Sequence, residues 1–90
     1  MTQWRVEIHP VVFKEDFKKV PPSDQQEIVR QVRKKLTVAP EDYGEPLRGN
    51  YKNYWKLRVG DYRVIYRIEK QRVSVKVIKI GVRRDYQVYQ

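Results

Sequence analysis

Apolar and polar residues alternate on both sides of Gly60-Asp61, inside the stretch from Leu47 to Tyr66. A two-residue link with glycine can close a tight antiparallel hairpin, because glycine tolerates the positive φ that such turns require. The turn places Val59 opposite Tyr62, and counting outward pairs the rest of the two strands. One face then collects the apolar side chains Trp55, Leu57, Val59, Tyr62, Val64 and Tyr66. The other face collects Tyr54, Lys56, Arg58, Arg63, Ile65 and Arg67, so we expect it to be strongly cationic.

The N-terminal half of the chain shows one strand pattern and two helix patterns. Trp4, Val6 and Ile8 alternate with polar residues and predict a half-buried strand that ends at Pro10. A short first helix is expected from there to the Pro21-Pro22 break. A second helix of about fourteen residues should follow, ended by Pro40. Its expected start is a capping box formed by Ser23 and Gln26, and its apolar stripe is Ile28, Val29, Val32 and Leu36.

The rest of the chain is predicted to form a loop before the hairpin and a third antiparallel strand after it. Glycine, proline and asparagine are frequent from Glu41 to Asn53, which indicates a loop. After Tyr66, a two-residue turn at Lys70-Gln71 would pair Ile68 with Val73, and Gly81 should end the strand. This register extends the apolar face and adds Arg67, Ser74, Lys76 and Ile78 to the cationic face, although a one-residue change would swap the sides.

The order of these elements predicts an α+β fold of two layers. We expect an N-terminal strand, a two-helix hairpin and then a three-stranded antiparallel meander, with both helices packed on one face of the sheet. The pattern does not identify the neighbour of the first strand. A length of 90 residues suits one domain, spanning 1–90.

The amino-acid composition favours some classes of function and argues against others. Twenty Lys and Arg against eleven Asp and Glu give a net charge of +9, which favours a polyanion or an acidic partner. The chain has no cysteine and one histidine, His9, which argues against thiolate metal sites, metal hydrolysis and a Ser-His-Asp arrangement. His9 is expected at the surface, at the end of the first strand. Without a signal-peptide pattern or a long apolar run, the sequence predicts a cytoplasmic protein.

The cationic face has two interpretations. Basic side chains on a strand can simply be the solvated side of a half-buried sheet, where they discourage edge pairing. They can also bind a phosphodiester and stabilise the charge of a phosphorane-like transition state without a metal. Arginine forks suit phosphate, and Arg58, Arg63 and Arg67 share this face with Glu69 at its far end, which favours an anion site.

Two segments, LRGNYKNYWKLRVGDYRVIYRI and VIKIGVRRDYQVY, resemble the signature of the RelE/ParE toxin superfamily. The predicted element order is also similar to the fold of that family. The resemblance implies a RelE-like toxin with a RelB-like antitoxin partner. It further implies an endoribonuclease that cleaves mRNA in the ribosomal A site through the ribose 2′-hydroxyl, with no cofactor and no metal, in contact with mRNA and rRNA.

The resemblance also implies roles for individual residues. Lys56 matches a lysine assigned to acid–base or charge-stabilising work, and Arg63 and Arg83 match arginines that contact the scissile phosphate. Tyr89 matches a tyrosine that orients or stacks against the mRNA base. A second family lysine is replaced here by Tyr54, which removes one candidate proton-transfer group. Further nucleic-acid contacts are expected from Arg48, Tyr54, Arg58, Lys76 and Arg84.

Two other functions fit the same sequence. One is a ParE-like toxin that would inhibit DNA gyrase and cleave nothing. The other is an inactive, plain basic RNA-binding module, or a family member that has lost its activity. The presence of Lys56, Arg63, Arg83 and Tyr89 together favours the endoribonuclease.

Overall fold

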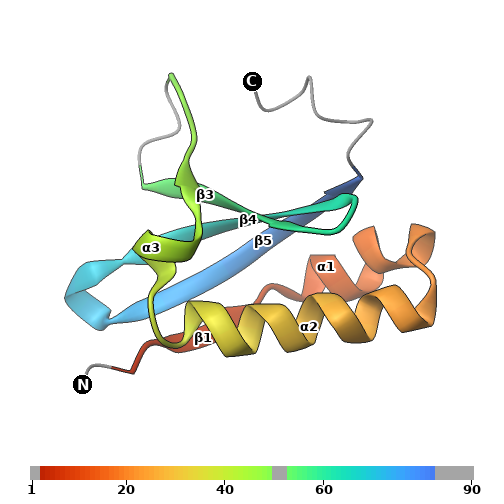
Figure 1. The fold of residues 1–90 in the computed structure, drawn as a ribbon, viewed down its shortest axis with the longest axis horizontal. Coiled ribbons are helices and arrows are strands. Elements are labelled where there is room, and N and C mark those ends of the chain that lie inside the picture. The colour runs from red at the N-terminus through yellow and green to blue at the C-terminus, as the bar shows by residue number, and fades with distance from the viewer. Residues whose placement is uncertain (1–2, 50–52, 83–90) are drawn as a thin grey trace.

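The structure is a computed structural model, and it describes residues 3–49 and 53–82. Figure 1 shows a mixed sheet with helices on one of its faces, so the predicted α+β class is confirmed. The sheet has the strand order β1-β5-β4-β3-β2. The strands are β1 (Arg5–Ile8), β2 (Glu45–Pro46), β3 (Tyr54–Val59), β4 (Tyr62–Glu69) and β5 (Ser74–Val82).

The first predicted helix is shorter than expected. It is an α-helix only over α1 (Pro10–Lys14), and the chain continues as a 3-10 helix, η1 (Asp16–Lys19). His9 caps α1, because its Nδ1 accepts a hydrogen bond of 3.0 Å from the Val11 N–H. The chain turns extended at Val20 before the prolines, and the Gln25 amide donates to the main-chain oxygens of Phe17 and Val20.

The predicted capping box at the second helix is wrong. The helix α2 (Pro22–Leu36) begins two residues earlier, with Pro21 rather than Ser23 as its N-cap and no side-chain capping bond. Pro22 serves as the first helical residue because its missing N–H would have no partner there. The apolar stripe is as expected, with Ile28, Val32 and Leu36 buried against the sheet.

The hairpin of β3 and β4 has the predicted register. Val59 lies opposite Tyr62, Arg58 opposite Arg63 and Lys56 opposite Ile65, and Gly60 has the positive φ of 57°. The predicted apolar face lies under the helices. Its residues belong to, or pack against, a core cluster that includes Val12, Phe17, Ile28, Val32, Leu36, Leu57, Val64, Tyr66, Val75 and Val77.

The third strand differs from the prediction in register and in length. A 3-10 turn, η2 (Lys70–Arg72), and a left-handed Val73 precede β5, so Ile68 pairs with Val75 rather than with Val73. The two-residue difference preserves the side that each residue faces. An irregularity between Ile65 and Tyr66 shifts the pairing again and leaves Ile78 without a paired residue on β4. Gly81 does not end the strand, because it pairs with Arg63 inside β5.

Two parts of the sheet were not predicted. β1 runs parallel to β5, with Val6 paired to Val75, so the sheet is not purely antiparallel. The expected loop contains a short helix, α3 (Pro40–Tyr43), and the two-residue strand β2, which pairs with Trp55 and Lys56 of β3. Within the described ranges, no helix is long and apolar enough to cross a membrane.

Candidate nucleic-acid interface

The sheet face opposite the helices carries the predicted cations on three neighbouring strands. Arg58 of β3 lies directly across from Arg63 of β4, and Arg67 of β4 lies between Tyr54 of β3 and Lys76 of β5. Lys56 lies opposite Ile65, one step along the same face from Arg58 and Arg63. We call this surface the basic face, made of Tyr54, Lys56, Arg58, Arg63, Arg67 and Lys76.

Arg63 is the buried cation of this face. Its exposed fraction is 5%, and the neighbouring Ile65 is 2% exposed. Arg58, by contrast, is exposed, and the two arginines border one hollow of about 80 Å³ near the hairpin tip. A charge with little solvent around it is screened less, so the Arg63 charge would interact more strongly with a nearby anion than the charge of an exposed arginine.

Lys56 lies beside a carboxylate that the sequence analysis missed. Its side chain is 14% exposed, and its Nζ lies 3.9 Å from Oε2 of Glu45 in β2. Glu45 lies directly across from Lys56 in the sheet. Glu45 is in a segment that the sequence predicted to be a loop. The sequence therefore gave no reason to pair it with β3.

The remaining predicted contacts are spread around the basic face. The Arg67 guanidinium lies 5.9 Å from the centre of the Tyr54 ring, at cation–π distance. Lys76 is half-buried on β5, and Arg48 is exposed after β2. Arg83, Arg84 and Tyr89 lie outside the described residues, so their predicted roles stay predictions.

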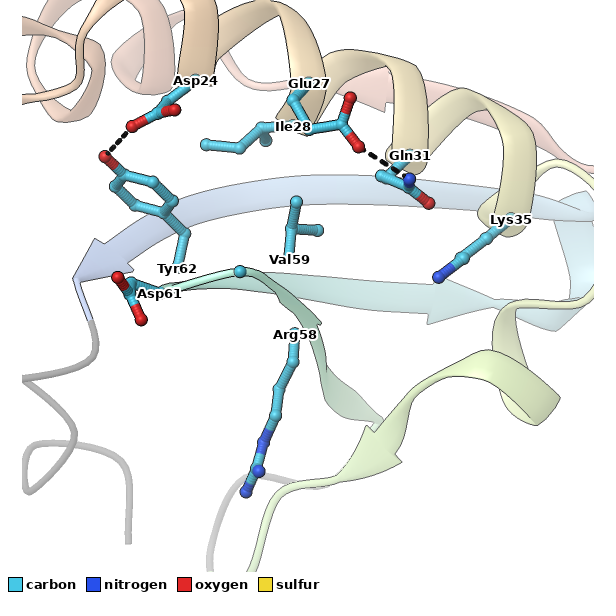
Figure 2. Close-up of a pocket in the computed structure, with 10 residues that line it drawn as sticks. Asp24, Glu27, Ile28, Gln31, Lys35, Arg58, Val59, Asp61 and Tyr62 are labelled. Carbon is cyan, nitrogen blue, oxygen red and sulfur yellow. Dashed lines mark hydrogen bonds between the residues drawn. The ribbon is translucent and has the colours of Figure 1, made fainter.

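A larger groove lies on the helix side of the hairpin and has a different character. Its volume is about 400 Å³, and it runs between α2 and the β3–β4 turn (Figure 2). The Tyr62 hydroxyl donates a 2.7 Å hydrogen bond to Asp24 Oδ2, and this bond, with some burial, raises the pKa of Tyr62. Figure 2 shows Arg58 pointing away from α2. Acidic side chains, among them Asp24 and Glu27 of α2, line this groove together with the cations Lys35 and Arg58, so it has mixed charge, unlike the basic face.

The basic face presents arginine and lysine side chains on neighbouring strands. In the part of the chain that the structure describes, no group of three or more His, Cys, Asp and Glu side chains is placed to hold a metal. Arginine and lysine donors arranged on a rigid sheet can bind a phosphodiester and stabilise charge that develops on it.

Comparisons with known proteins identify the family of this chain. Residues 8–86 match the family model described as the ParE toxin of the type II toxin–antitoxin system parDE. The chain is also 30% identical to the toxin RelG of Mycobacterium tuberculosis over 70 residues, covering 78% of this chain and 80% of RelG.

Solved structures of toxin–antitoxin complexes share the fold. The RelBE2 complex of M. tuberculosis contains a chain that is 26% identical, with a TM-score of 0.83 over 92% of this chain and 94% of that one. The archaeal RelE–RelB complex of Pyrococcus horikoshii contains a chain that is 29% identical, with a TM-score of 0.71 over 92% of this chain and 97% of that one.

Proposed function

The chain belongs to the ParE toxin family within the RelE/ParE superfamily and is a toxin of a toxin–antitoxin pair. We propose that this toxin is a ribosome-dependent endoribonuclease. It would cleave mRNA in the A site, in the cytoplasm, and a RelB-like antitoxin would hold it inactive. The observation that supports this proposal best is the basic face, where Lys56, Arg58 and the buried Arg63 lie on adjacent strands.

The proposed reaction is an internal transfer at phosphorus. The 2′-oxygen of the ribose forms a bond to the adjacent phosphorus while the bond from phosphorus to the 5′-oxygen breaks. The 2′-hydroxyl loses a proton and the leaving 5′-oxygen gains one, so a cyclic phosphate and a free 5′-hydroxyl result. The reaction requires no cofactor or metal.

The position of each residue on the basic face suggests its role in the proposed cleavage. Arg63 would hold the non-bridging phosphate oxygens, because a guanidinium donates two parallel hydrogen bonds to such an anion. Lys56 would stabilise charge or move a proton at a reacting oxygen. Arg58, Arg67 and Lys76 would hold the flanking backbone, with Tyr54 stacking near Arg67. The tail would add Arg83 at the phosphate and Tyr89 at the base.

Primer extension on translating and non-translating RNA tests the proposal. We expect cuts inside A-site codons of translated messages, and Arg63→Gln should lower cleavage by about a hundredfold or more. Because Arg63 is buried, circular dichroism must show that the variant folds. Arg33→Gln is the matched control, since Arg33 is exposed on α2, which packs on the other face of the sheet. Wild-type cleavage by a folded Arg63→Gln variant would contradict the proposed site.

A second function is favoured by the family description itself, which names ParE. A gyrase inhibitor of this fold would use its surface to bind protein and would leave messages intact. Growth arrest with uncut messages and altered plasmid supercoiling would therefore favour gyrase inhibition over RNA cleavage.

A further inference from the structure

Glu45 brings a carboxylate to the edge of the basic face. Its Oε2 lies 3.9 Å from the Lys56 Nζ, and the two residues are a cross-strand pair between β2 and β3. Glu45 is more open than its partner, because its side chain is 66% exposed while that of Lys56 is 14% exposed. The ion pair therefore joins an exposed carboxylate to a largely buried lysine side chain.

The segment that carries Glu45 is anchored to the sheet from both directions along the chain. Before it, the Tyr66 hydroxyl donates to the Pro40 main-chain oxygen, and Gly44 packs directly on that phenol. After it, the Leu47 N–H donates to the Tyr54 main-chain oxygen over 2.9 Å. A two-residue strand has little stability of its own, so these anchors decide where the Glu45 carboxylate lies.

A lysine side chain needs such a partner to hold one position. Its ammonium group sits on a flexible four-carbon stem, and ordering that stem costs conformational entropy. An ion pair from a fixed strand favours the rotamers that keep the ammonium group near Glu45, and therefore on the basic face between β2 and β4.

We propose that Glu45 is a positioning residue for Lys56, holding the ammonium group where the scissile phosphate meets the basic face. This inference rests on the proposed function, because it assigns the positioned Lys56 a use in RNA cleavage. Glu45 acts through Lys56 and is not itself assigned a contact with RNA.

Single-turnover cleavage on programmed ribosomes tests the inference with Glu45→Gln, which preserves size and removes the charge. We expect the rate at saturating toxin to fall about three- to fivefold, with the half-saturating concentration changed by less than about twofold. Glu41→Gln is the matched control, because Glu41 is in the same segment but pairs with Lys70 at 3.4 Å, and it should cleave like the wild type. In a Lys56→Gln background, Glu45→Gln should have no further effect.

A second measurement does not depend on cleavage. The Lys56 side-chain nitrogen resonance of the free toxin should shift in Glu45→Gln and stay in place in Glu41→Gln. An unchanged resonance, or an equal loss of rate with and without Lys56, overturns the inference. If wild-type toxin cuts no RNA while the Lys56 resonance still responds to Glu45→Gln, it is the proposed function that fails.

Discussion

The Tyr66 hydroxyl donates a hydrogen bond of 2.6 Å to the main-chain oxygen of Pro40, across 26 positions of sequence. Tyr66 is fully buried at the centre of β4, and Pro40 begins α3. The bond joins the core of the sheet to the segment that carries Glu45. The position of Glu45 at the edge of the basic face therefore depends on a contact that also stabilises the fold.

Tyr66→Phe should destabilise the protein by about 1–2 kcal/mol, because it leaves a buried carbonyl oxygen without its donor. Urea unfolding followed by circular dichroism measures the loss. Tyr43→Phe is the control, since Tyr43 is 53% exposed and its hydroxyl should contribute little. Equal stability of the two variants would show that the Tyr66 bond does not anchor α3.

Gly44→Ala should destabilise the protein by about 1–3 kcal/mol through steric overlap. A Cβ at this position would lie 1.7 Å from the Tyr66 hydroxyl oxygen and 3.0 Å from the Lys56 main-chain oxygen. Combining Gly44→Ala with Tyr66→Phe removes the closest overlap, so the double variant should lose less than the sum of the two single losses. Additive losses in urea unfolding would contradict the packing of Gly44 on the phenol.

Val73→Asn should stabilise the protein by about 0.5–1 kcal/mol. Val73 has φ 50° and ψ 49°, a left-handed conformation that a β-branched residue adopts at a cost and that asparagine tolerates better. Val73 is only half-buried, which limits the loss of packing. Thermal unfolding should show a higher Tm for Val73→Asn and no gain for Val73→Ile, which is equally branched.

Asp16→Ala should weaken the end of β5. The Asp16 carboxylate accepts a 2.8 Å hydrogen bond from the Ile80 N–H, beyond the last residue that pairs with β1. Hydrogen exchange at Ile80 should become about tenfold faster, because the amide loses its acceptor. Asp16→Asn retains an acceptor oxygen and should stay close to the wild type. Unchanged Ile80 exchange in Asp16→Ala would rule out this role.

Stability should fall at alkaline pH, and Tyr66 should account for part of the fall. Burial, with a smaller contribution from the Glu41 charge, raises the pKa of Tyr66 well above its ordinary value near 10. As pH rises, the Tyr66 hydroxyl loses its proton at a lower pH in the unfolded chain than in the folded one. The stability that neutral Tyr66 contributes is therefore fully present below pH ~10 and is lost as pH rises further. Urea unfolding across this range should show a shallower decline for Tyr66→Phe, and an identical decline would contradict the shift.

Local sequence information was enough for the β3–β4 hairpin and for its two faces. The turn at Gly60-Asp61 involves adjacent residues, so its geometry sets the register of every pair outward, including Arg58 with Arg63. Alternation then decides which side chains face the helices. The same reasoning was wrong at Lys70-Gln71, where the turn signal was weak and a left-handed Val73 lengthened the connection.

The tertiary structure alone decided which distant segments meet. Three contacts join residues that no tight turn connects: the parallel pairing of β1 with β5, the anchoring of α3 by Tyr66, and the pairing of Glu45 with Lys56. Patterns of alternation and turn residues are local, whereas these contacts depend on how the elements share one core. The sequence by itself therefore determined the chemistry of the basic face, and the fold determined which carboxylate lies beside its lysine.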